Sequence, residues 1–211
     1  MRIKILDHPL VAHKISVLRD KNTPSPTFRQ LVDELVTLLA YEATREIRVE
    51  QREIETPVAR TVGTMIASPK PLVVPILRAG LGMLDGVLDL LPTAKISVVG
   101  LQRDEETLQP VSYFEKLVSK MDKRPAMILD PMLATGGSMV ATIDLLKKKG
   151  CRNITALVLV AAPEGVKLVN DKHPDVKIYT AALDSHLNEN GYIIPGLGDA
   201  GDKIFGTKQT A

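Results

Sequence analysis

Between residues 71 and 183 the chain alternates between short apolar runs and segments with a helical repeat. Apolar runs typical of buried strands lie at 71–77, 95–100, 126–130, 153–160 and 176–183. Helical repeats lie between them, from the residues after Gly80 to about Leu91, at 138–149 and at 164–171. Strands rich in Val, Ile and Leu that alternate with crossover helices are typical of a mainly parallel sheet covered on both faces. The pattern predicts an α/β fold with a mainly parallel sheet flanked by helices.

The first 70 residues precede this alternation. Residues 1–24 show no clear helical repeat and are predicted to form an irregular arm. Ser25-Pro26 is typical of a helix start, and a leucine repeat predicts that the helix runs to about Ile47. Thr56-Pro57 repeats the start signal, and a second helix is predicted there. Its apolar face would consist of Val58, Val62, Met65 and Ile66.

From His186 onward the alternation of strand and helix patterns ends, and the sequence becomes rich in glycine. The glycine-rich stretch 190–202 is predicted to be a shaped loop, too irregular for a helix or strand. Gly196, Gly198 and Gly201 spell G-x-G-x-x-G, but only ten residues follow, which leaves no room for the rest of a dinucleotide-binding unit. Closely spaced glycines do let a ligand approach the backbone. The stretch therefore predicts a binding loop for a small planar molecule.

Length and composition fit one domain that spans residues 1–211. The chain has 211 residues and is 45% hydrophobic, enough to bury a full-sized core. We divide it into an N-terminal arm with helices (1–70), an α/β core (71–184) and a C-terminal tail (185–211).

The net charge and the residue composition limit the classes of binding partner and the cellular compartment that we expect. The formal net charge is +2 and no basic run exceeds Lys147-Lys148-Lys149, which argues against nucleic acid. The apolar runs are too short for a membrane span, and the N-terminus lacks a signal-peptide core. Cys151, the single cysteine, excludes an intrachain disulfide and indicates a reducing compartment, so a cytoplasmic location is predicted. His8 and His13 have no third ligand at a convincing metal spacing and are expected to be structural or exposed.

The stretch 127–138 carries the first candidate chemistry. An apolar strand ends on Asp130, a loop of small residues follows, and a helical repeat opens at Ser138. Such a unit suits phosphate, because bare backbone N–H groups and the positive end of the helix dipole point at one spot. The loop has no Lys and does not match a Walker-type P-loop. Phosphate binding would need positive charge from elsewhere, and an ordinary strand–helix turn is the alternative.

Two arginines could supply that charge. Arg78 follows the apolar run at 71–77, and Arg103 follows the run at 95–100. If these strands are neighbours, both guanidiniums could converge on one crevice, where their forked donors suit phosphate. A helix N-terminus alone stabilises an anion by only about 0.3–1 kcal/mol, so a multiply charged phosphate needs cations as well. A surface charge is the alternative for each arginine.

Two further features flank this crevice. Asp130 would repel phosphate, so it is expected to face ribose hydroxyls or to act through Mg²⁺, unless it only forms the turn. The polar stretch 101–116 is long for a strand–helix connection and predicts either a lid or a solvated hairpin.

Taken together, the motifs resemble the phosphoribosyltransferases, and among them the uracil phosphoribosyltransferase family. The resemblance runs along the whole chain and rests on His8-Pro9-Leu10, on residues 75–80, on residues 130–138 and on residues 196–202. The core Ala-Thr-Gly-Gly-Ser at 134–138 is shared widely among enzymes that bind phosphoribosyl pyrophosphate (PRPP). Most such loops begin with two adjacent acids, whereas Pro131 occupies the second position here, as it does in the uracil branch.

The resemblance implies a set of roles. PRPP would be held by Arg78, Arg103, Asp130, Pro131, Met132, Leu133, Ala134, Thr135, Gly136, Gly137, Ser138 and Asp199. Uracil would be held largely by backbone groups of Ile193, Gly198, Asp199 and Ala200. Asp130, Arg103 and Asp199 would be the catalytic residues.

The same resemblance implies the reaction and its partners. Uracil and PRPP would give UMP and pyrophosphate, with Mg²⁺ bound through PRPP and no metal site built from protein alone. Some members are activated by GTP, and a homo-oligomer is expected. Two alternatives remain: a PRPP- or UMP-sensing regulator that binds RNA on the same fold, and a transferase for another base.

Overall fold

The computed structural model describes residues 2–103 and 110–207. Within them, nine strands form one central sheet in the order β1-β11-β10-β8-β4-β6-β7, with β5 beside β4 and β9 beside β10. The strands are Ile3–Ile5 (β1), Leu72–Leu77 (β4), Lys95–Ile96 (β5), Val98–Arg103 (β6), Pro110–Lys116 (β7), Ala126–Leu129 (β8), Met132–Leu133 (β9), Ile154–Ala161 (β10) and Lys177–Leu183 (β11). The pairing of β6 with β7 is antiparallel and the other pairings in this sheet are parallel, so the predicted α/β fold is confirmed.

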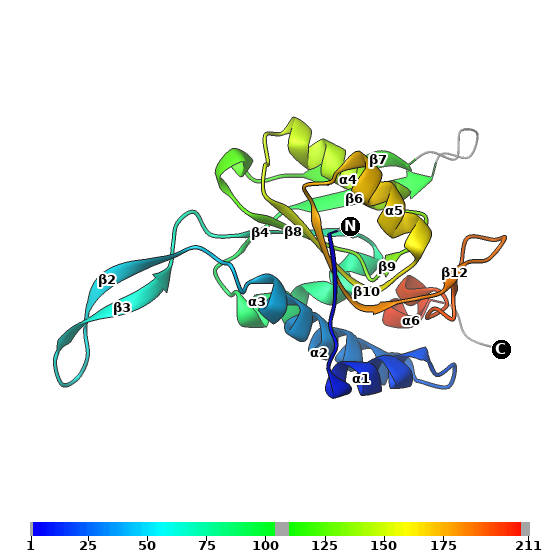
Figure 1. The fold of residues 1–211 in the computed structure, drawn as a ribbon, viewed down its shortest axis with the longest axis horizontal. Helices are drawn as coiled ribbons and strands as arrows, with labels where there is room; N and C mark the ends of the chain where they lie inside the picture. Colours follow the sequence, from blue (N-terminus) through cyan, green and yellow to red (C-terminus); the bar gives the residue numbers. More distant parts are fainter. Residues whose placement is uncertain (1, 104–109, 208–211) are drawn as a thin grey trace.

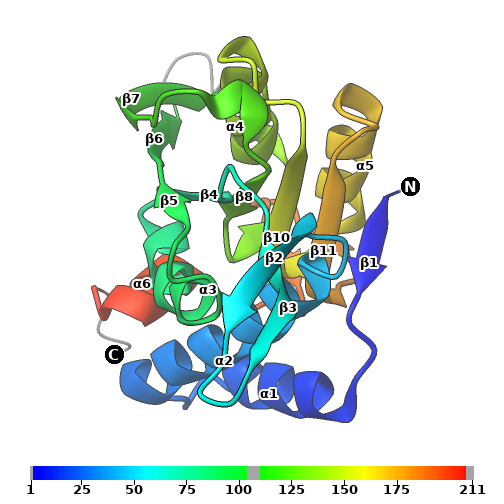
Figure 2. The ribbon, with the colours of Figure 1, turned by 90° about the vertical axis from the view of Figure 1, so that its left-hand side faces the viewer.

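Helices cover both faces of the sheet (Figure 1). One face packs against α1 (Pro9–Arg19), α2 (Ser25–Ala43), α3 (Leu84–Leu90) and α6 (Ala200–Phe205). The other packs against α4 (Gly137–Lys148) and α5 (Pro163–Lys172). Figure 2 shows α1 and α2 side by side beneath the sheet, with β1 and β7 towards its opposite edges. Because each face has its own apolar cluster, the sheet is a rigid platform whose strand ends can hold a site.

The second predicted helix is wrong, because residues 49–66 form a β-hairpin. Strands β2 (Val49–Glu55) and β3 (Arg60–Ile66) pair antiparallel and extend away from the body (Figure 1). Thr56 closes the turn: its hydroxyl oxygen accepts from the backbone N–H of Val58 and of Ala59, at 3.2 and 3.0 Å. The same side-chain chemistry caps helices, so Thr-Pro alone does not separate the two structures. Val58 is 95% exposed, which shows that the supposed apolar face is not buried.

The N-terminal arm is more regular than predicted. Residues 9–19 form α1, in which Val11, Ile15 and Leu18 are buried, and the backbone N–H of Leu10 donates to Nδ1 of His8 at 3.1 Å. His8 is therefore a helix cap. The next helix, α2, ends at Ala43, four residues before its predicted end.

The tail also contains more regular structure than predicted. Short strands β12 (His186–Leu187) and β13 (Ile193–Ile194) pair antiparallel, and α6 follows. Of the stretch 101–116, the described parts belong to the β6–β7 hairpin, while residues 104–109 lie outside the described residues. Two 3₁₀ turns complete the fold, η1 (Ala79–Met83) and η2 (Met121–Lys123). None of the helices in the described ranges combines the length and apolarity that crossing a bilayer requires.

Candidate functional site

The backbone places three candidate residues at the same edge of the sheet. Arg78 follows β4, Arg103 ends β6 and Asp130 follows β8. Strand β4 pairs in parallel with both β6 and β8, so the strands before Arg78 and Arg103 are neighbours, which was the condition for the two arginines to converge. Ligands of open α/β sheets bind outside such carboxyl ends. A wider hollow of about 390 Å³ lies at the opposite, amino-terminal edge and is not where this topology places a ligand.

The loop after β8 encloses a small cavity of about 170 Å³. Its lining residues are Asp130, Met132, Leu133, Ala134, Thr135, Gly136, Gly137, Ser138 and Met139. Pro131 is buried and does not line it; its carbonyl accepts from the backbone N–H of Leu159 and Val160 at 3.0 and 3.2 Å. The cavity therefore brings together the predicted loop residues, with Pro131 fastening the loop to β10.

The geometry of this loop suits an anion. Gly136 adopts a left-handed conformation (φ +88°), which turns the chain into α4. The first backbone N–H groups of α4 have no carbonyl partner within the helix and are available to a ligand. Thr135 and Ser138 are exposed, so their hydroxyls are accessible as well. The cavity is large enough for a phosphate group and has donors on one side.

Helix α5 supports this loop from behind, through a residue that the sequence did not single out. A Cβ atom built on Gly165 would lie 2.2 Å from the carbonyl oxygen of Ala134, so only glycine fits there. Its neighbour Glu164 accepts from the backbone N–H of Leu187 at 3.0 Å. The first turn of α5 thus contacts both the loop and the tail.

Asp130 is partly buried at the start of the loop. Its burial raises the pKa of the carboxyl from the usual value to about 7, and the backbone N–H of Met132, 3.3 Å from Oδ1, opposes that shift. Without a cation or hydrogen-bond donors from a ligand, this carboxylate is costly to charge. Such a group is suited to receive hydroxyl donors or a metal-bearing substrate.

Arg78 lies between the sheet and the tail. Its guanidinium is 3.4 Å from Oδ1 of Asp202 and 5.6 Å from the ring centre of Phe205, and its side chain is 57% exposed. The following glycine holds the segment close to β8, since a Cβ on Gly80 would lie 2.3 Å from the carbonyl oxygen of Leu129. The Arg103 side chain lies outside the described residues.

The tail lies beside the 130–138 loop and the segment after β4, since a Cβ on Gly191 would lie 4.0 Å from Cγ2 of Thr135 and Asp202 pairs with Arg78. Gly198 and Asp199 are exposed, whereas Ile193 and Ala200 are buried and could meet a ligand only through backbone groups. Asp199 is the N-cap of α6, and its Oδ1 accepts from the backbone N–H of Asp202 at 2.9 Å.

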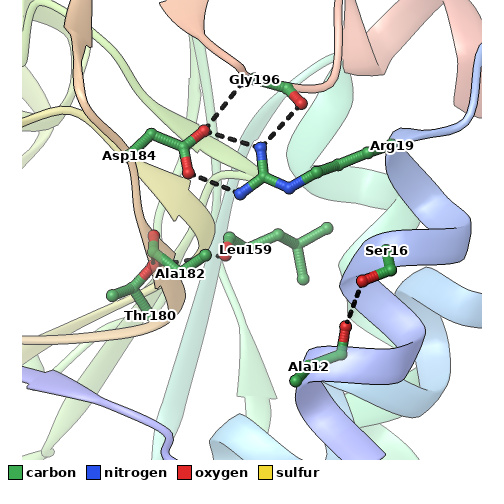
Figure 3. Close-up of polar contacts among 8 residues, drawn as sticks. All are labelled: Ala12, Ser16, Arg19, Leu159, Thr180, Ala182, Asp184 and Gly196. Atoms are coloured by element: carbon green, nitrogen blue, oxygen red, sulfur yellow. Dashed lines mark hydrogen bonds and ion pairs between the residues drawn. The ribbon is translucent and has the colours of Figure 1, made fainter.

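A salt bridge between Arg19 of α1 and Asp184, directly after β11, holds the tail at Gly196. Arg19 and Asp184 both hydrogen-bond to Gly196, as Figure 3 shows. Neither Arg19 nor Asp184 was among the residues predicted from the sequence. Asp184 could have been found from the sequence, because it is an acid directly after a strand, as Asp130 is. Arg19 lies 165 positions away from Asp184, and no local sequence feature indicates its role.

A protein-only metal site is absent from the part of the chain that the structure describes, where no three His, Cys, Asp or Glu side chains group to hold an ion. Asp130, the acid that lines the 130–138 cavity, fits a divalent ion that takes its other ligands from water and a bound phosphate. Mg²⁺ is usually bound in this way.

Comparisons with known proteins show what the whole chain is similar to. The family model for uracil phosphoribosyltransferase matches residues 5–207. The chain is 60% identical to the uracil phosphoribosyltransferase of Beutenbergia cavernae over 209 residues, which cover 98% of this chain and 99% of that relative.

Solved structures show the same fold. A protein from Aquifex aeolicus superposes with a TM-score of 0.91 at 37% identity, covering 96% of this chain and 97% of that one. The adenine phosphoribosyl transferase of Trypanosoma brucei, solved with AMP, pyrophosphate and ribose-5-phosphate, superposes with a TM-score of 0.60 at 11% identity, covering 90% and 87%. The latter likeness shows the fold alone.

Proposed function

Because the chain belongs to the uracil phosphoribosyltransferase family, we propose that its crevice transfers the 5-phosphoribosyl group of PRPP to N1 of uracil. The products are UMP and pyrophosphate. The observation that supports this most strongly is the 130–138 cavity beside the glycine-rich tail, in a chain that matches the family over nearly its whole length.

The 130–138 loop would hold the PRPP phosphoribosyl group. Its N–H groups and the Thr135 and Ser138 hydroxyls would surround the 5′-phosphate, with Asp130 on the ribose side. The pKa of Asp130, raised to about 7 by burial, supports this role, because hydroxyl donors from ribose would stabilise its charged form. Binding of substrate and ionisation of Asp130 would then favour each other.

Arg78 and Arg103 would hold the pyrophosphate. Arg78 contacts Asp202 at 3.4 Å and is largely exposed, and such pairs contribute only about 0–1 kcal/mol. PRPP could therefore displace this contact at little cost. Mg²⁺ carried by PRPP would add charge neutralisation for the leaving pyrophosphate.

The reaction needs positioning more than covalent help. The bond from the anomeric carbon to pyrophosphate breaks with oxocarbenium character as uracil N1 attacks. Holding both substrates in line, and placing cations where negative charge accumulates, supplies most of the acceleration in such reactions.

The tail would select the base. Backbone groups of Ile193, Gly198, Asp199 and Ala200 offer fixed donors and acceptors, and Asp199 would also reach PRPP. Replacing the O4 acceptor of uracil by the amino donor of cytosine leaves buried groups unpaired, which can reject a substrate by roughly 10⁴-fold.

The proposal also covers regulation, oligomeric state and cellular location, of which the first two follow from the family resemblance. We expect a homo-oligomer, activation by GTP, and a cytoplasmic location that the buried, unpaired Cys151 fits. Initial rates with and without GTP, and the mass in solution, test the first two.

Initial-rate measurements with Mg²⁺, PRPP and uracil test the proposed reaction. UMP should form only when both substrates are present, and neither orotate, hypoxanthine nor cytosine should replace uracil. Tight RNA binding without turnover would instead favour the regulator, and faster turnover with another base would favour a different transferase.

A further inference from the structure

Four hydrogen bonds join the N-terminal helix, the last core residue Asp184 and the tail at one point (Figure 3). Arg19 Nη1 donates to Asp184 Oδ2 at 2.8 Å, and Nη2 donates to Asp184 Oδ1 at 2.5 Å. Arg19 Nη1 also donates to the carbonyl oxygen of Gly196 at 2.9 Å, while the Gly196 N–H donates to Asp184 Oδ2 at 2.9 Å. Both backbone polar groups of Gly196 are therefore bound by one ion pair.

This ion pair is shielded from water. The side chain of Asp184 is 3% exposed and that of Arg19 is 21% exposed. The backbone N–H of Asp184 is fixed in turn to the carbonyl of Ala161 in β10, at 2.8 Å. A bidentate, buried pair attached to the sheet holds its partners in one geometry, unlike a flexible surface pair.

Gly196 lies at the centre of the tail. It adopts a left-handed conformation (φ +64°), and a Cβ on it would lie 2.1 Å from the carbonyl oxygen of Ile193. The exposed residues Gly198 and Asp199 follow two and three positions later. The orientation of the Gly196 peptide groups therefore sets the direction in which the proposed uracil-binding backbone leaves the turn.

We propose that Arg19 and Asp184 are positioning residues for the base: through Gly196 they hold the tail backbone in the conformation that recognises uracil. This inference rests on the proposed function. Neither side chain lines the 130–138 cavity, and their hydrogen bonds go to each other and to Gly196. Loss of the Arg19–Asp184 pair should therefore weaken the binding of uracil much more than the binding of PRPP.

Two single variants test the pair with minimal change in volume. Arg19→Lys keeps the charge but loses the fork that contacts both Asp184 oxygens and Gly196. Asp184→Asn places an amide donor opposite Arg19 or the Gly196 N–H in either orientation of the amide. In each variant we expect the KM for uracil to rise about tenfold or more while the KM for PRPP stays within about twofold.

A double variant separates stability from recognition. Replacing both partners of a buried ion pair by apolar residues often restores stability that a single replacement loses. We expect Arg19→Met/Asp184→Leu to melt at a higher temperature than Asp184→Leu alone, yet to keep the raised KM for uracil, because Gly196 has lost both partners. A KM for uracil that recovers together with the melting temperature would show a merely structural pair and overturn the inference.

Lys14→Ala is the matched control. Lys14 lies on the same helix α1, and its ion pair is with Glu34 of α2 rather than with a residue of the tail. It should leave both KM values unchanged. Equal rises of both KM values in the Arg19 and Asp184 variants would also overturn the inference, whereas a wild-type protein that does not use uracil would instead refute the proposed function.

Discussion

Replacing Gly165 tests whether the close packing of α5 against the 130–138 loop is needed for activity. In Gly165→Ala the new methyl group would lie 2.2 Å from the carbonyl oxygen of Ala134, a backbone atom of the loop itself. Neither atom is at the end of a flexible side chain. Either α5 or the loop must move to accommodate the methyl group.

The required movement can be estimated from the contact distances. The tightest tolerable Cβ contacts begin at 3.0–3.4 Å, so α5 and the loop must separate by about 0.8–1.2 Å. Overpacking of this kind costs about 1–3 kcal/mol, offset by up to about 1 kcal/mol from better helix propensity. A displacement of about 1 Å at a reacting group can lower the rate by roughly 10²-fold. We therefore expect a small loss of stability and a drop of about 10–100-fold in kcat/KM for PRPP.

Gly86→Ala is the matched control for this variant. Gly86 is also the third residue of its helix, α3, and a Cβ there would lie 2.5 Å from the carbonyl oxygen of Asp33 in α2, away from the 130–138 cavity. Urea unfolding should show similar losses of stability in both variants, while initial rates at varied PRPP should fall only in Gly165→Ala. Normal kinetics in Gly165→Ala, or an equal kinetic loss in Gly86→Ala, would refute the reasoning.

Three further predictions concern the candidate site. The pKa of Asp130 is raised to about 7 in the folded protein, so ionisation of this carboxyl destabilises the wild-type fold as pH rises from about 4 to about 7. Over that range the unfolding free energy of Asp130→Asn should therefore increase relative to that of the wild type. A difference between the two proteins that does not change with pH would contradict the raised pKa. Arg78→Ala should raise the KM for PRPP far more than that for uracil, and equal rises would indicate a structural role. Asp199→Asn keeps the side-chain cap of α6 and should lose turnover with little loss of stability. Asp199→Ala should lose turnover and also about 0.5–2 kcal/mol of unfolding free energy, because the cap is lost. Unchanged turnover in Asp199→Asn would show that the carboxylate takes no part in the mechanism.

The core of the fold could be predicted from the sequence, because its strands are buried on both faces. Continuous apolar runs such as 72–77 and 154–161 can hardly be anything but buried strands in a chain that also carries amphipathic helices. The loop after β8 was recognisable for a related reason. Its glycines and hydroxyls lie directly between an apolar strand and a helical repeat, so local pattern and function coincide.

The predictions from sequence were wrong or incomplete where a local motif fits two structures, or where contacts with distant segments determine the structure. Thr56-Pro57 suits a helix start and a hairpin turn equally, and only the exposure of the flanking residues distinguishes them. In α1, three buried residues depend on packing against α2 and the sheet. Gly165 and Arg19 act through contacts with residues far away in sequence, Ala134 and Asp184, which no local pattern encodes.

A crystal structure of the protein with UMP would locate both parts of the proposed site at once, because UMP carries both the phosphate and the base. We expect the phosphate within hydrogen-bond distance of the N–H groups at 134–138, and the uracil ring against the backbone of Ile193 and residues 198–200. A phosphate bound outside the 130–138 cavity, or a base that does not contact the tail, would contradict this expectation.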